Sequence, residues 1–297
     1  MNLRLLSYFV ACVEQKTMHA AAAASFISQP ALSKAIQKLE EELGVQLLER
    51  RPRGVVPTAY GEVLFRYAKL VEAQLRQATS EIDAMRGQAR GTISLGVIPS
   101  SSYISSRLAE LVTNEHPGLS LKLIADSTTG LLPALADGEI DFALVLSMTG
   151  SLPGLVFEPL MRTHTTLVVR KTHPLLGLEK VGLEDLLAYP WMMARFPAEH
   201  RACVNRTYLN AGMVPPQPAI EINSIAYFGE ALRRTDLIGL ASIALINNQT
   251  WGEDLVSFEF DFGFPEEIIG LAYREKTVFL PGAATIRDII RREIGPR

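Results

Sequence analysis

The chain has 297 residues, of which 48% are hydrophobic and 21% charged, so it can bury one or two cores and is not disordered. Its two cysteines, Cys12 and Cys203, cannot build a disulfide framework or a thiolate metal cluster, and they favour a reducing compartment. The charge is divided unevenly, because residues 1–90 hold 12 Lys and Arg against 9 Asp and Glu, whereas the rest holds 17 against 23. A cationic head can approach phosphates while the acidic body stays in solution.

The start of the chain resembles a helix rather than an export signal. Its apolar stretch, residues 7–13, is followed at once by Glu14 and Lys16, and it is too short for a signal peptide. The apolar residues recur at the spacing of an amphipathic helix that packs on a core. The sequence also lacks a run of about 18 uncharged apolar residues, which excludes a transmembrane helix. We therefore expect a cytoplasmic protein.

The first 57 residues predict three short helices, at about 3–15, 18–25 and 29–43. Ser28 can cap the third helix, Pro30 fits its first turn, and Gly44 can take the left-handed conformation at its end. One side of this helix is apolar and predicts a core contact. The opposite side is polar and free to contact a partner, and it carries Pro30, Ser33, Lys34 and Gln37.

A basic turn follows the third helix. It spans residues 50–54 and contains Arg50, Arg51 and Arg53. Short apolar segments at 45–48 and 55–56 flank it, which is the pattern of a two-stranded wing. Three guanidinium groups at a loop tip suit phosphate oxygens or a minor groove. An exposed turn without a partner is the alternative.

The segment from Thr58 to about residue 87 contains no proline and predicts one long helix. Its apolar residues step by four and three, as in a coiled-coil seam. The seam consists of Leu64, Ala68, Val71, Leu75, Ala78, Ile82 and Met85. Such a narrow stripe favours pairing with a second copy, although packing against the chain's own body is the alternative. Residues 87–91 then predict a flexible hinge.

Beyond the hinge, strands and helices alternate and predict two α/β lobes. Segments 92–98, 119–125 and 141–146 are the strands of a first parallel sheet. A second series begins near residue 163, with strands at 167–169, 191–193, 221–222 and 237–241 and helices near 184–187, 199–211, 225–233 and 242–248. The strand at 268–273 and the helix at 283–293 return the chain to the first lobe. Clefts between such lobes are where small ligands bind.

Three segments stand out by their order and spacing, namely residues 28–36 (SQPALSKAI), 39–45 (LEEELGV) and 47–50 (LLER). Together they closely resemble the signature of LysR-type transcriptional regulators. Residues 57–61 (PTAYG) are similar to the family's junction between wing and linker. The resemblance continues through residues 138–143 (GEIDFA) and 173–175 (HPL), so it covers the whole chain.

The resemblance implies an α+β chain with a winged helix-turn-helix at 1–58, a linker and dimerisation helix at 59–90, and an effector-binding domain at 91–297. That domain is similar to periplasmic binding proteins, with lobe I at about 91–162 and 268–297 and lobe II at about 163–267. The implied partners are double-stranded DNA, a small-molecule effector and further copies of the chain. Two dimers would form a tetramer that bends DNA, and RNA polymerase is a further candidate partner.

In the family, the start of the third helix enters the major groove. Carried over by position, Gln29, Pro30, Ser33 and Lys34 should face base edges, and Arg53 should serve the wing. The full predicted DNA-binding set is Ser28, Gln29, Pro30, Ser33, Lys34, Gln37, Arg50, Arg51 and Arg53. Gln can pair with adenine and Lys with guanine. The family more often has Arg at position 34, and Lys lacks its planar fork. Ser33 could instead bond its own helix.

The resemblance places the effector between the lobes. The matching positions are Ser100, Ser101, Ser102, Thr128, Arg195, Phe196 and Ser224. Hydroxyls and N–H groups at a strand-to-helix turn can bind an anion, an arginine can clamp a carboxylate, and a phenylalanine can cover an apolar ring. These residue types favour a small organic acid. The alternative is that the serines only cap the helix after Pro99.

The sequence shows no catalytic or metal-binding pattern. GxSxG, P-loop and HExxH motifs are absent, and the five histidines lack ligand spacing. We therefore expect no enzyme activity, no metal and no cofactor. A solute-binding protein with the same two-lobed body is the competing function, although it would need neither the basic wing nor the heptad helix. A repressor that needs no ligand is a third possibility, which effector titration would separate.

Overall fold

The structure is a computed structural model, which describes residues 2–52, 54–85, 92–194, 198–222, 224–247, 254–275, 279 and 281–294. The chain forms two compact units, one containing residues 1–88 and the other nearly all of 89–297. No described helix combines the length and the apolar character needed to cross a membrane.

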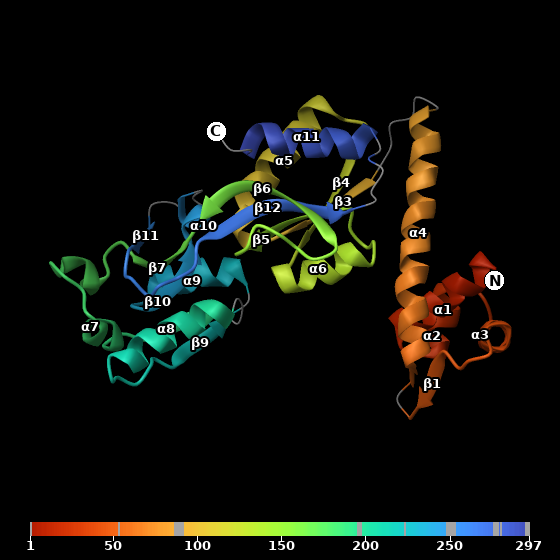
Figure 1. Cartoon of the computed structure of the whole chain (residues 1–297), viewed down its shortest axis with the longest axis horizontal. Coiled ribbons are helices and arrows are strands. Elements are labelled where there is room, and N and C mark those ends of the chain that lie inside the picture. Colours follow the sequence, from red (N-terminus) through yellow and green to blue (C-terminus); the bar gives the residue numbers. More distant parts are fainter. Residues whose placement is uncertain are drawn as a thin grey trace. The chain divides into compact units, whose positions relative to one another are not determined.

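The N-terminal unit consists of three short helices, a hairpin and one long helix (Figure 1). These are α1 (Leu3–Gln15), α2 (Met18–Ala24), α3 (Gln29–Leu43), β1 (Leu48–Arg51), β2 (Gly54–Pro57) and α4 (Ala59–Met85). Each short helix begins with a side-chain cap, from Asn2, Thr17 and Ser28. Their apolar faces meet around Phe9, Ala21 and Leu32, each of which is fully buried. Small alanines on α2 allow this close helix packing.

The hairpin differs from the sequence prediction. Its first strand begins at Leu48 rather than Val45, so Arg50 and Arg51 lie in β1 and not in the turn. The cause lies in α3, since the Glu40 carboxylate accepts the backbone N–H groups of Leu47 at 2.8 Å and Leu48 at 3.2 Å. These donors are tied to the helix, and strand pairing starts only after them. The register then joins Leu48 to Pro57 and Arg51 to Gly54.

Lobe I of the second unit is built on a five-stranded sheet with the order β4-β3-β5-β12-β6. Its strands are β3 (Thr92–Val97), β4 (Ser120–Ala125), β5 (Phe142–Ser147), β6 (Leu155–Thr163) and β12 (Glu267–Arg274). Strand β3 runs parallel to β4 and β5, whereas β12 is antiparallel to both of its neighbours. Helices α5 (Ser102–Glu115) and α11 (Pro281–Ile294) cover one face and α6 (Thr128–Ala136) the other (Figure 1).

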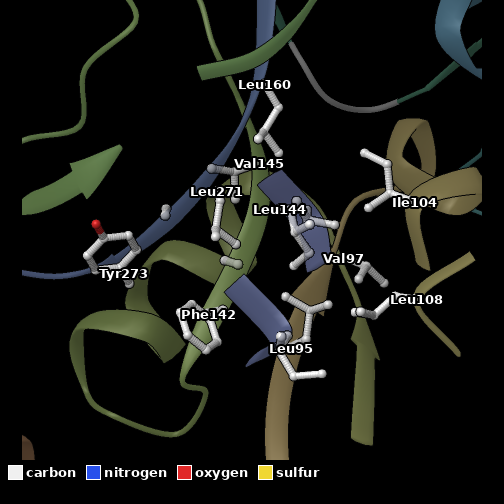
Figure 2. Close-up of a cluster of buried hydrophobic side chains, with 14 of the residues drawn as sticks. Leu95, Val97, Ile104, Leu108, Phe142, Leu144, Val145, Leu160, Leu271 and Tyr273 are labelled. Atoms are coloured by element: carbon white, nitrogen blue, oxygen red, sulfur yellow. The ribbon is translucent and has the colours of Figure 1, made fainter. Parts of the chain in front are cut away.

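The core of lobe I is continuous from the central strands to the helices. Figure 2 shows Ile104 and Leu108 of α5 beside Val97 of β3. Phe142 of β5 lies edge-to-face with Tyr273 of β12, with ring centroids 6.1 Å apart. Phe142 and Tyr273 come from segments more than 100 positions apart, so the returning strand β12 completes the core of the lobe.

Lobe II is built on a second five-stranded sheet with the order β11-β7-β10-β8-β9. Its strands are β7 (Thr165–Arg170), β8 (Trp191–Ala194), β9 (Pro218–Ile222), β10 (Ile238–Ser242) and β11 (Leu255–Phe258), and its helices are α7 (Leu183–Leu187), α8 (Ala198–Asn210), α9 (Ile225–Arg234) and α10 (Ile243–Asn247). Along β7 the side chains alternate between two cores. Leu167 and Val169 pack toward α8, whereas Val168 packs toward α9.

Two strands, β6 and β11, are absent from the sequence prediction. In β6 the charged Glu158 and Arg162 and the proline Pro159 interrupt the apolar pattern. The strand tolerates proline because it is the outer strand of its sheet. A register shift between Ile269 and Gly270 of β12 lies opposite this proline. The predicted two-lobed α/β architecture is confirmed, with these strands added at the sheet edges.

Candidate DNA interface and effector site

Helix α3 presents a polar, solvent-facing surface at its N-terminal end. The Ser28 hydroxyl accepts the Ala31 N–H at 3.4 Å and starts the helix. Leu32 and Leu39 are fully buried and hold the opposite face against the core. Burial of these leucines fixes the rotation of the helix, so the residues at the opposite positions must face outward.

The predicted reading residues lie on that outward surface. Gln29, Pro30, Lys34 and Gln37 are exposed and Ser33 is half-buried. Among the residues that the structure describes, Ser33 has no hydrogen-bond partner for its hydroxyl, so its own helix does not use it. Gln37 differs, because its amide donates to Glu41 at 3.0 Å. It would have to leave that partner in order to contact a base.

The wing carries its arginines on a strand. Arg50 and Arg51 are exposed in β1, and Arg51 pairs with Glu49 at 3.3 Å. Both side chains are well exposed in this pair, so it adds little stability and can open when phosphate is near. Arg53, the third predicted wing residue, lies outside the described residues.

The first two residues of the predicted seam on α4 pack against the chain itself. Ala68 is fully buried against Leu6 and Val10 of α1, and Leu64 packs in the same place. Farther along, Val71, Leu75, Ala78 and Ile82 are exposed. The side chain of Met85 lies outside the described part of the chain. The four exposed residues, which we call the open seam, are the part that a second copy could cover.

The predicted effector residues of lobe I follow the carboxyl ends of parallel strands. Ser100, Ser101 and Ser102 come directly after β3, and Thr128 follows β4. Because parallel strands end at one edge of a sheet, these residues share that edge. Ser101 is fully buried and donates to the Ile98 carbonyl at 2.7 Å.

The Thr128 hydroxyl is also occupied, since it accepts the Leu146 N–H at 3.2 Å. Ser101 and Thr128 therefore shape the edge, whereas the Ser100 and Ser102 hydroxyls have no hydrogen-bond partner within the described ranges and can bind a ligand. In lobe II, Ser224 stands at the start of α9 without capping it. Arg195 and Phe196, the other predicted contacts there, lie outside the described residues.

A buried polar cluster at the junction of the lobes has no counterpart in the sequence prediction. Glu267 at the start of β12 is only 1% exposed. Its carboxylate lies 3.1 Å from His200 Nε2 of α8 and accepts the Thr165 hydroxyl at 3.3 Å. Nearby, the hydroxyls of Thr163 and Ser242 are 2.7 Å apart.

The members of this cluster are far apart in sequence, and no local pattern connects them. Hydrogen bonding satisfies polar groups that would otherwise be costly to bury. The cluster therefore joins the crossing strand to lobe II. It does not resemble a metal site, and no group of three possible metal ligands occurs in the described part of the chain.

A winged helix-turn-helix with an exposed polar surface on α3, joined in one chain to a two-lobed α/β domain, is the architecture of a transcription regulator. Two protein families match the chain in this order. "Bacterial regulatory helix-turn-helix protein, lysR family" matches residues 3–62, and "LysR substrate binding domain" matches residues 86–295. The chain belongs to the LysR family of transcriptional regulators, which confirms the resemblance seen in its sequence.

Named relatives agree with this assignment. The HTH-type transcriptional regulator PcaQ of Agrobacterium fabrum is 30% identical over 279 residues, which cover 93% of this chain and 89% of the relative. The HTH-type transcriptional regulator GbpR of Azospirillum brasilense is 28% identical over 300 residues, covering 98% and 86% of the two chains.

Solved structures show the same fold. CbnR, a LysR family transcriptional regulator, has a TM-score of 0.65 with 22% identity and full coverage of both chains. A full-length OxyR variant from Pseudomonas aeruginosa has a TM-score of 0.66 with 21% identity, covering 98% of this chain and 95% of that one. These structures support the fold, and the two family matches show that the chain is a DNA-binding regulator with an effector-binding domain rather than a solute-binding protein.

Proposed function

We propose that the start of α3 reads base edges in the major groove through Gln29, Pro30, Ser33 and Lys34. Ser28 and Gln37 lie beside these residues. The wing contacts the DNA backbone or the minor groove through Arg50, Arg51 and Arg53. The observation that carries this proposal is the unused polar surface at the start of α3. Its amide, hydroxyl and ammonium groups match the donor and acceptor patterns of base edges. The exposed guanidinium groups of β1 supply phosphate contacts, which position the protein without reading sequence.

The protein acts, in this proposal, as a dimer joined along the open seam of α4. Four exposed apolar residues at heptad spacing support the pairing, and two paired recognition helices would contact half-sites about one helical turn apart. Two dimers form a tetramer. RNA polymerase is a further partner, because relatives include proteins named as activators, such as the SDS degradation transcriptional activation protein of a Pseudomonas species. The site of action is the cytoplasm, where bacterial DNA is found.

The effector in this proposal is a small organic acid that binds at the strand ends of the two lobes. Ser100, Ser102 and Ser224 offer hydroxyls without hydrogen-bond partners among the described residues, and Arg195 and Phe196 supply a cation and an apolar ring. Binding would favour one arrangement of the lobes over another, so that the ligand shifts a population rather than starting a reaction.

The test is binding of the purified protein to the intergenic DNA upstream of its own gene, compared with unrelated DNA across a salt series. Selective binding with a steep salt dependence supports the proposal. The same DNA then serves for titration with small carboxylates. A protein that remains monomeric and binds both DNAs equally contradicts it.

A further inference from the structure

The turn between α2 and α3 contains a residue that the backbone does not favour. Helix α2 ends in a Schellman motif, in which Phe26 N–H donates to the Ala23 carbonyl and Ile27 N–H to the Ala22 carbonyl, both at 3.1 Å. Phe26 is the left-handed residue of this motif, with a φ of 54°. Glycine usually occupies that position, since a Cβ atom is unfavourable there.

Packing within the fold does not explain this phenylalanine. Its side chain is 96% exposed, more than any other large hydrophobic residue in the described part of the chain. The next residue, Ile27, behaves as the motif requires and packs against the core of the N-terminal unit. Phe26 therefore combines an unfavourable backbone conformation with a ring that the protein does not bury. Residues in unfavourable backbone conformations cluster at functional sites, so this one motivates a functional hypothesis.

The location of Phe26 indicates what the ring contacts. It lies two residues before the Ser28 cap and three before Gln29, so it continues the reading surface of α3 toward α2. When the start of α3 enters the major groove, this turn is carried to the DNA with it. The apolar groups that a duplex offers there are thymine methyl groups and deoxyribose carbons.

We propose that the Phe26 ring is a DNA contact, packed against a thymine methyl or a deoxyribose beside the recognition helix. This inference rests on the proposed role of α3 in reading DNA. It assigns an apolar contact to a surface whose other members are polar or cationic. An apolar contact does not displace counterions, so its removal lowers affinity without changing the salt dependence.

The experiment compares wild type with three full-length variants, Phe26→Gly, Phe26→Asn and Phe26→Tyr. Glycine suits the left-handed conformation and removes the ring, whereas tyrosine keeps the ring in place. Phe26→Asn is the second ring-free variant, because asparagine also tolerates this conformation. Affinity for the selected upstream DNA is measured across salt concentrations, and hydrogen exchange over residues 18–43 reports the local stability of the turn.

The expected result for the ring-free variants is a dissociation constant raised about three- to tenfold, the loss typical of one apolar contact. In these variants the slope of affinity against salt concentration stays unchanged, and hydrogen exchange in α2 and α3 is no faster than in wild type. Phe26→Tyr binds DNA like wild type. A second DNA carries deoxyuridine in place of thymidine and therefore lacks the thymine methyl groups. If the ring contacts a methyl group, the affinity of wild type for this DNA falls by the same factor; if it contacts a deoxyribose, the affinity is unchanged.

Unchanged affinity of folded Phe26→Gly and Phe26→Asn would overturn the proposal while leaving the role of α3 intact. A changed oligomeric state with unchanged DNA affinity would also overturn it, because the ring would then contact a second copy. If wild type itself does not select the upstream DNA, the proposed reading role of α3 fails, and this contact fails with it.

Discussion

The open seam of α4 gives a quantitative prediction for dimer stability. Leu75 is 46% exposed in the single chain, so a partner helix can bury about half of its side chain. Complete burial of a leucine side chain contributes about 1.5–3 kcal/mol. Burial of the exposed half of Leu75 therefore contributes about 1 kcal/mol per subunit to the free energy of dimerisation. A symmetric dimer buries two copies, and alanine retains a part of each contact. Leu75→Ala should therefore weaken the dimer by about 1–2 kcal/mol, which raises its dissociation constant about 5- to 30-fold.

Sedimentation velocity over a dilution series measures this constant directly. The matched control is Arg66→Gln, because Arg66 is exposed on α4 and falls on the opposite side of the heptad. A second test position is Ile82, which is 57% exposed and should respond similarly. If Leu75→Ala has the same dimer dissociation constant as wild type and Arg66→Gln, the open seam lies outside the dimer interface and the prediction is wrong.

Three further predictions concern other parts of the chain. Gln29→Ala should relax the base preference at one operator position, whereas Arg50→Ala should lower the affinity for all DNA sequences alike and reduce the slope of affinity against salt by about one. Selection from a randomised operator tests this, and an equal change of specificity in both variants would contradict it. Burial opposes ionisation of Glu158, but hydrogen bonds from Arg291 and Tyr273 outweigh it and hold its pKa below the ordinary 4.5. The stability that Glu158 gives the folded protein is thus fully present above pH 4.5, the ordinary pKa of the carboxyl, and is lost as the pH falls through the lower pKa of the folded state. Glu158→Gln should lower the free energy of unfolding by about 1–3 kcal/mol at pH 7. The variant should also lose less stability than wild type on acidification, which urea unfolding at several pH values can test. Burial raises the pKa of Cys12 to about 11, so native protein at pH 8 should react slowly with iodoacetamide at this thiol; rapid alkylation detected by mass spectrometry would contradict this.

The helices of the N-terminal unit were predictable because their signals are local. Ser28 caps α3 and Gly44 ends it within one turn of the residues they serve. The start of β1 was not predictable in the same way, since it depends on a carboxylate seven positions earlier. The heptad pattern of α4 likewise could not show that α1 covers Ala68.

The effector edge shows a different limit of sequence reasoning. The resemblance named seven residues there, but it could not separate hydroxyls that shape the turn from hydroxyls that remain available. Ser101 belongs to the first kind, because its hydroxyl closes the turn after β3. His200 and Glu267 are 67 positions apart, and only the tertiary fold brings them together.

The double crossing between the lobes has a mechanical consequence. The chain passes from lobe I to lobe II at His164, whose carbonyl accepts the Ile243 N–H at 2.9 Å, and it returns through residues 259–266 into β12. Buried hydrogen bonds lie beside both passages, since Thr163 pairs with Ser242 and Thr165 with Glu267. Sliding of one lobe along the other would break these bonds, whereas a small bend or twist of the crossing strands would keep them. We therefore expect any movement between the lobes to be a change of angle, which displaces the outer surface of a lobe more than the surface beside the crossing.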